Sequence, residues 1–183
     1  MSTVEELKAF TEKKLEAILM SPSENRVRAS LARLRHGVGH APGELPELWG
    51  EFLLELPENL MGHGEPSAAE WAIYIALTMF ALHQQGKDRK ASPMHRRGNS
   101  LGTAARCLIE NEEDRERVAR RFYPIAVASD MSALSHHLRS LISLLRAEDI
   151  PLDYVRLAAD LYYFQNPKTA DRFDSAGVRI SAG

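Results

Sequence analysis

The 183-residue chain has only one cysteine, Cys107, and this scarcity excludes several classes of protein. A single thiol can form neither an internal disulfide nor a multi-cysteine metal site, so nothing calls for an oxidising compartment. Long hydrophobic runs are also absent, because the longest nearly uncharged stretch, residues 71–82, is far shorter than the ~20 residues that span a bilayer. The charged, amphipathic N-terminus does not resemble a signal peptide. We therefore expect a cytoplasmic protein with no membrane partner.

Charges of one sign are missing from whole segments, although the formal net charge is only -2. Residues 41–86 contain seven glutamates and no lysine or arginine. Residues 26–36 contain four arginines, residues 89–109 contain five arginines or lysines, and neither segment has an acidic residue. If the basic segments share one face of the fold, that face carries a positive field on a slightly acidic molecule.

Sustained alternation of apolar and polar residues is also missing, and helical periodicity is present instead. Thr3 with Glu6, and Ser67 with Glu70, match the capping box that begins a helix. Pro124 should kink or split the helix that contains it. Helices are predicted over residues 3–20, 24–36, 46–56, 71–85, 101–111, 113–128, 133–146 and 151–165.

These signals predict an all-α fold, a compact helical bundle of about eight helices. We expect one domain over residues 1–173 and a short, flexible tail over residues 174–183. The helix over residues 71–85 is apolar on nearly all sides, which places it in the core. The linker around residues 87–93 leaves open a division into two helical halves that share this core.

Helical angles direct several arginines toward solvent. Between residues 24 and 36, an apolar stripe separates two exposed flanks of the helix. Between residues 133 and 146, four leucines define a buried stripe, and residues seven apart share the opposite side. The first helix carries Arg26 with Arg33 on one flank and Arg28 with Arg35 on the other, and the later helix exposes Arg139 with Arg146.

Residues 94–106, MHRRGNSLGTAAR, combine two adjacent arginines, a glycine turn and a helix start. Free N–H groups at a helix start and the bidentate donors of Arg96 and Arg97 suit phosphate oxygens, and Arg106 points outward from the same helix. The stretch matches neither nucleotide-binding glycine motif, so it favours a polyanion and predicts no cofactor. The alternatives are a solvated turn for this stretch, ion pairs with glutamates of neighbouring helices for the four arginines of residues 26–35, and a solvated helix face for Arg139 and Arg146.

Catalytic and metal sites are not predicted. His36 and His40 are four residues apart, but Gly37 and Gly39 between them break the helix that would bring both onto one face. Cys107 has no obvious base nearby in the sequence, which favours a half-buried structural thiol. No group of nucleophile, base and acid is present, so we expect no catalytic residue and no bound metal.

Several blocks of the sequence resemble the CasB family, the small subunit of the type I-E CRISPR interference complex Cascade. The blocks are RASLARLRHGVG (28–39), PELW (46–49), AEWAIYIALTMFALHQQGK (69–87), MHRRGNSLGTAAR (94–106) and HHLRSLISLLRAEDIPLDYVRLAADLYYFQNP (136–167). The resemblance implies an all-helical, non-catalytic subunit that is present as a pair beside CRISPR RNA. It also implies contacts with other Cascade subunits and with the target and displaced strands of an R-loop.

The matching blocks identify a set of candidate nucleic-acid-binding residues, which coincides with the arginines already selected by charge. The set is Arg26, Arg33, Arg35, Arg96, Arg97, Arg106, Arg139 and Arg146. Two other classes of function stay open. One is a protein-only helical scaffold whose arginines bind acidic partner helices, and the other is a small helical hydrolase.

Overall fold

The computed structural model describes residues 2–169, and it confirms the all-α class. Three single-turn 3-10 helices, η1 (Pro46–Leu48), η2 (Leu53–Glu55) and η3 (Glu58–Leu60), lie between α2 and α3. The described part has seven α-helices, one fewer than the approximate number predicted. They are α1 (Thr3–Leu19), α2 (Glu24–His36), α3 (Ala68–Gln84), α4 (Leu101–Arg106), α5 (Glu112–Ala126), α6 (Met131–Ala147) and α7 (Tyr154–Phe164).

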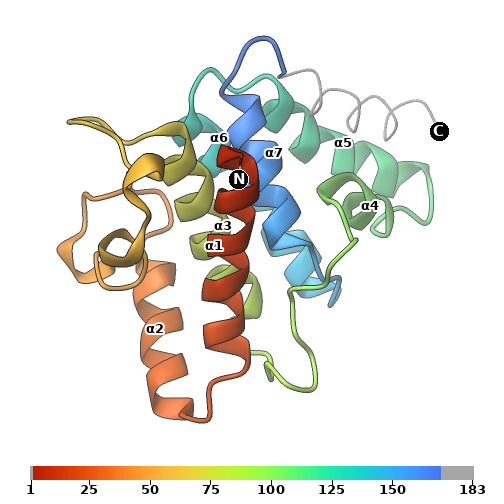
Figure 1. The fold of residues 1–183 in the computed structure, drawn as a ribbon. Coiled ribbons are helices and arrows are strands. Elements are labelled where there is room, and N and C mark those ends of the chain that lie inside the picture. The colour runs from red at the N-terminus through yellow and green to blue at the C-terminus, as the bar shows by residue number, and fades with distance from the viewer. Residues whose placement is uncertain (1, 170–183) are drawn as a thin grey trace.

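α3 is the central helix, because 14 of its 17 residues are buried. It packs against α1, α2, α6 and α7, and Figure 1 shows it behind α1. The predicted capping box begins it: the Glu70 N–H donates to Ser67 Oγ at 3.0 Å, and the Ser67 N–H donates to Glu70 Oε2 at 2.6 Å. Gly86 ends it with a φ of +77°, a left-handed conformation that glycine adopts without strain.

The predicted helix over residues 46–56 is wrong, since this segment forms separate 3-10 turns at one edge of the molecule. Its apolar residues at spacing four are nevertheless buried, as the helical pattern required: Leu48, Phe52, Leu56 and Leu60 are each at most 4% exposed. Gly50 weakens a helix here, and the Trp49 indole N–H donates to the Gly43 carbonyl at 3.0 Å. The segment therefore packs its apolar side chains without a regular helix.

Details of other helices also differ from the predictions, and several predicted bounds are off by two or three residues. The capping box of α1 is formed by Ser2 and Glu5, one residue earlier than predicted, because both registers satisfy the same pattern. Pro124 does not split α5, since it lies in the last turn and removes a hydrogen-bond donor only there. α4 ends at Arg106, several residues before the predicted end near residue 111.

Arg89 joins the linker to the N-terminal helix pair. Its side chain is buried, and its guanidinium donates to the carbonyls of Ile18 and Leu19 at the end of α1. It also donates to the Ser21 carbonyl at 2.7 Å and to Glu24 Oε1 at 2.5 Å. One cation therefore satisfies carbonyl groups that the end of α1 leaves without helical partners.

The linker does not divide the described residues into two halves, because one hydrophobic core includes residues from all seven α-helices. Gln84 Oε1 accepts from the Met94 N–H at 2.8 Å, which ties the linker to α3. Residues 174–183, predicted as a tail, lie outside the described residues. Among residues 2–169, no helix has the length and apolar composition needed to cross a membrane.

Candidate nucleic-acid interface

Hydrogen bonds to the start of α7 hold the two-arginine turn. The Arg96 N–H donates to the Leu152 carbonyl at 3.1 Å, and the Leu152 N–H donates to the Met94 carbonyl at 3.0 Å. The Gly98 N–H donates to Asp153 Oδ2 at 2.8 Å, and the φ of Gly98 is +86°. The backbone of this turn is therefore held in place, while both arginine side chains stay exposed.

The N-terminus of α4 is occupied by its own cap. Ser100 is the N-cap residue. Its Oγ accepts from the Thr103 N–H at 3.2 Å, and its carbonyl accepts from the Ala104 N–H at 2.8 Å. These donors are engaged within the protein, so the capacity of this segment to bind an anion rests on its arginine side chains, including the exposed Arg106.

Two of the predicted arginines are held by carboxylates. Arg97 Nη2 lies 2.6 Å from Glu12 Oε2, and Arg97 Nε lies 3.1 Å from Glu12 Oε1. The hydrogen bond to Glu12 raises the pKa of Arg97. Arg33 Nη2 and Nε lie 2.5 and 2.6 Å from Glu51 Oε1. For Arg33, the structure shows the ion pair that the sequence left open as an alternative. For Arg97, it shows an ion pair where the alternative was a solvated turn.

Arg146 lies at the C-terminal end of α3, where its positive charge acts on Arg35 of α2. Arg146 Nε donates to the Gln85 carbonyl at 3.1 Å, which anchors its side chain there. Burial, and then the nearby positive charge of Arg146, lower the pKa of the half-buried Arg35. Among residues 2–169, neither guanidinium group forms an ion pair with a carboxylate. Two like charges are therefore held near each other without a neutralising partner.

Lys87 adds a third positive charge at this end of α3. Its Nζ is paired with the carboxylate of Asp149, which is itself largely exposed. The charges of Lys87 and Arg146 both lower the pKa of the buried His83, after the larger effect of its burial. We call Arg35, Lys87 and Arg146 the α3-end cluster. Its net charge, with Asp149 included, is positive.

The α3-end cluster continues along two helices. Arg139 lies seven residues before Arg146 on α6, and Arg28 lies seven residues before Arg35 on α2. A spacing of seven keeps two residues on the same side of a helix, about 10 Å apart along its axis. Both Arg28 and Arg139 are exposed. The cationic surface therefore extends from the cluster over one side of each helix.

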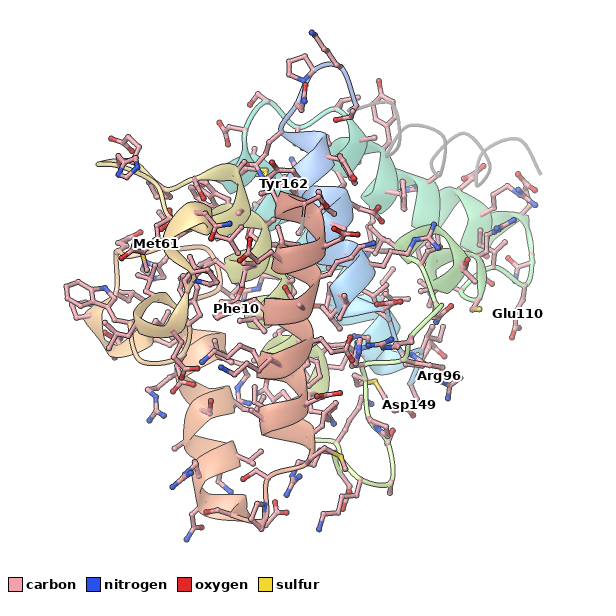
Figure 2. All side chains as sticks on the ribbon, in the orientation of Figure 1. Phe10, Met61, Arg96, Glu110, Asp149 and Tyr162 are labelled. Atoms are coloured by element: carbon pink, nitrogen blue, oxygen red, sulfur yellow. The ribbon has the colours of Figure 1, made fainter. Side chains whose placement is uncertain are left out.

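The structure does not gather all eight predicted arginines into one cluster. Arg26 and Arg33 line a different groove of about 370 Å³, on the other flank of α2 from Arg35. Figure 2 shows Arg96 on the opposite side of the view from Met61, which belongs to the glutamate-rich segment. The arginine turn is thus separated from that acidic segment, in agreement with the uneven charge distribution of the sequence.

The predicted set missed Arg28 and Lys87. Arg28 was recognised as exposed on its flank, and its position seven residues before Arg35 was the signal that could have added it. Lys87 follows Gly86, the residue that ends α3, and cations are favourable beside the negative end of a helix dipole. Both residues could therefore have been selected from helical spacing and helix ends.

The predicted helix break between His36 and His40 is confirmed, because α2 ends at His36, whereas the expectation about Cys107 is wrong. The His36 and His40 rings do come together, with centroids 6.0 Å apart, because the turn after α2 folds back. Each ring uses Nδ1 to contact a carboxylate, Glu47 at 3.0 Å for His36 and Glu44 at 2.7 Å for His40. Cys107 is exposed and not half-buried, because α4 ends just before it. Among residues 2–169, no three His, Cys, Asp or Glu side chains are placed to hold a metal ion.

A sequence profile of the family described as CRISPR-associated protein Cse2 matches residues 30–180, which is most of the chain. The chain belongs to the Cse2 family. A search of the curated proteins finds no match. The resemblance of the sequence blocks to the CasB family is confirmed.

Three solved structures of similar proteins share the fold of this Cse2-family chain. CasB from Thermobifida fusca is 34% identical, with a TM-score of 0.73 over 98% of this chain and 97% of that one. A CRISPR-associated protein of the Cse2 family from Thermus thermophilus is 19% identical, with a TM-score of 0.69 over 100% of both chains. A structure described as CasB from Thermus thermophilus is 20% identical, with a TM-score of 0.64 over 99% of this chain and 96% of that one.

Proposed function

We propose that this Cse2-family chain is a non-catalytic small subunit of a Cascade complex that holds nucleic acid by its backbone phosphates. In this role it stabilises the R-loop during recognition of invading DNA. Its proposed partners are the other Cascade subunits, a second copy of itself, CRISPR RNA, and the target and displaced DNA strands. Membership of a CRISPR-associated family supports a place in such a complex, which acts in the cytoplasm.

The proposal is carried by Arg35 and Arg146, two arginines whose charges act on each other and which have no carboxylate partner among residues 2–169. Like charges repel, and the repulsion is stronger where one group is partly removed from water. The negative end of the α3 dipole offsets part of this cost. A phosphate between the two guanidinium groups removes the repulsion and accepts hydrogen bonds from each. The cluster is therefore a suitable site for one phosphate, and Arg28 and Arg139 can contact neighbouring phosphates.

Binding of this kind recognises the backbone and not the bases. Cations that neutralise phosphates release condensed counterions, so affinity falls steeply with salt. Sequence specificity in an RNA-guided complex comes from pairing between the guide and the target strand. The subunit is then required to hold strands of any sequence, which exposed arginines on helix surfaces can do.

The experiment measures binding of a fluorescent single-stranded oligo-dT by the free chain and by the reconstituted Cascade complex. R35A/R146A removes the two repelling arginines, and R117A/R120A removes the same charge from α5, where both arginines are ion-paired. R35A/R146A should reduce the slope of log affinity against log salt by about 0.7, the value for the one phosphate held between them on a single strand. The α5 variant should change this slope much less. Equal slopes for the two variants, with native melting of both, contradict the proposal.

The Arg33–Glu51 and Arg97–Glu12 pairs favour a second candidate function, a protein-only scaffold. They show that exposed arginines of this chain bind carboxylates, as acidic partner helices would require. In that case R96E/R97E abolishes assembly of the complex and leaves DNA retention by the assembled fraction unchanged. For a nucleic-acid-binding subunit, the same variant assembles and retains DNA weakly.

A further inference from the structure

The two arginine–glutamate pairs share an arrangement in which the carboxylate is enclosed and the guanidinium is open to solvent. The Glu12 side chain is 17% exposed, whereas Arg97 is 72% exposed. The Glu51 side chain is 14% exposed, whereas Arg33 is 43% exposed. In each pair the arginine is therefore the partner that can turn toward solvent, while the glutamate stays in place.

A second contact holds Glu51, and the walls of a groove enclose Glu12. Glu51 accepts a second hydrogen bond, from the Ser30 hydroxyl of α2. Glu12 projects from the middle of α1 into a groove of about 800 Å³ between α1 and α7, which Arg97 and Asp153 also line. Asp153 accepts a hydrogen bond from the Gly98 N–H and caps α7. These contacts fix the position of the groove wall that Asp153 forms.

A carboxylate and a phosphate compete for the same donors of an arginine. Both present two oxygens at a spacing that fits the paired N–H groups of the guanidinium. Glu12 already contacts Nε and Nη2 of Arg97, which are the donors that a phosphate would use. While the pair is closed, Arg97 contributes no net charge toward a nucleic-acid strand.

We propose that Glu12 and Glu51 are internal competitors that occupy Arg97 and Arg33 until a phosphate displaces them, an inference that rests on the proposed function. The α3-end cluster, whose two arginines have no carboxylate partner among residues 2–169, makes the first contact with a strand. Arg97 and Arg33 then contribute only when a phosphate is presented close enough to displace a carboxylate. The pairs thus weaken binding to strands that the complex has not positioned, and they leave binding to correctly placed strands strong.

The decisive variant is E12Q, which keeps the shape of the side chain and removes its charge. Its matched control is E16Q, because Glu16 lies one turn later on α1, lines the same groove and makes no ion pair among the described residues. Free oligo-dT is the probe, measured between about 50 and 200 mM salt. E12Q should tighten binding about two- to fivefold more than E16Q, the range expected for an exposed ion pair. It should also steepen the log–log salt slope by about 0.7, one additional phosphate.

A double-mutant cycle tests whether the effect acts through Arg97. In the R97A background, E12Q should change affinity no more than E16Q does, because the arginine that it releases is absent. E51Q, compared with E58Q from the same glutamate-rich segment, should behave as E12Q does, and its effect should disappear in R33A. Melting temperatures of all variants exclude unfolding as the cause.

The outcomes separate this inference from the proposed function. If R35A/R146A binds oligo-dT as the unmodified chain does, both fail, since no strand is held at the cluster. If R35A/R146A weakens binding but E12Q and E16Q have equal effects, the proposed function survives and the competitor inference is overturned. If E12Q still tightens binding in the R97A background, the competitor inference is also overturned.

Discussion

His83 is an ionisable residue inside the core of the protein. Its ring is fully buried on α3, and Nδ1 lies 2.9 Å from the Tyr154 hydroxyl. Among the described residues, its Nε2 has no hydrogen-bond partner. Burial, then the positive charge of Lys87, lower the pKa of His83 from 6.5 to about 4. The folded protein therefore keeps this histidine neutral where an unfolded chain would protonate it.

This difference predicts that stability decreases as the pH falls from about 6.5 to about 4. In that window the unfolded chain binds a proton at residue 83 and the folded chain does not, so protonation favours unfolding. The loss is about 3 kcal/mol in the free energy of unfolding across the window. Urea titrations at a series of pH values measure it.

The control is H83N, which keeps a polar group beside Tyr154 and cannot titrate in this range. Its pH dependence should be shallower than that of the unmodified chain. It should not be flat, because burial also lowers the pKa of His95. Parallel stability curves for the two proteins would show that His83 does not cause the effect.

At the residue level, the sequence predicted which side chains are exposed better than what they contact. The buried stripes of α2 and α6 are confirmed, with Leu31 at 8% and Leu138 at 0% exposure. The Arg97–Glu12 pair joins residues 85 positions apart, and helical angles within one element contain no information about such a contact. The charge interaction between Arg35 and Arg146 likewise depends on how α2 and α6 pack around α3.

Capping residues determine where the helices begin, and their importance depends on burial. Ser67 caps the central helix α3, and its hydroxyl also donates to the Leu60 carbonyl. Ser2 caps α1 with the same box, but it is exposed at the start of the chain. The same chemistry thus supports one helix in the core and one at the surface.

We predict that S67A destabilises the protein by about 2 kcal/mol and S2A by about 0.5 kcal/mol. The larger value reflects the loss of the bond to Leu60 in addition to the cap, at a partly buried position. Thermal unfolding of the two variants measures the difference. Equal shifts in melting temperature would mean that the contact to Leu60 adds nothing.

At the level of elements, strong local signals predicted the helices well. α2 has the predicted bounds, because a serine cap, an apolar stripe and Gly37 agree. Residues 46–56 do not form the helix that their apolar spacing predicts. Leucines and Phe52 at a spacing of four residues fit a helix and a series of 3-10 turns equally. Packing against α2 and α1, which local sequence does not encode, selected the turns.

Across the whole molecule, one core links residues before and after the linker. Leu7 of α1 and Leu161 of α7 are both fully buried in it, and α1 packs directly on α7. The sequence left open two helical halves because the linker is polar and contains Pro93. Local composition could not show that Met94 is buried and that Gln84 ties the linker to α3.

We therefore predict a single cooperative unfolding transition in urea. Helix content by circular dichroism and the fluorescence of Trp49 and Trp71 should change together, because no part of the core is independent of the rest. Trp49 lies in the 3-10 segment and Trp71 on α3, so the two probes report different regions. Two separated transitions would instead indicate halves that unfold independently.

The burial of Arg89 has a consequence for synthesis of the chain. A ribosome releases α1 and α2 long before residue 89, yet the end of α1 and Glu24 depend on that guanidinium for their hydrogen bonds. We expect nascent chains that stop before residue 89 to be cut by protease at the α1–α2 connection, and the complete chain to resist. The helices α1 and α2 are synthesised first, but the contact with Arg89 that stabilises their connection forms only later.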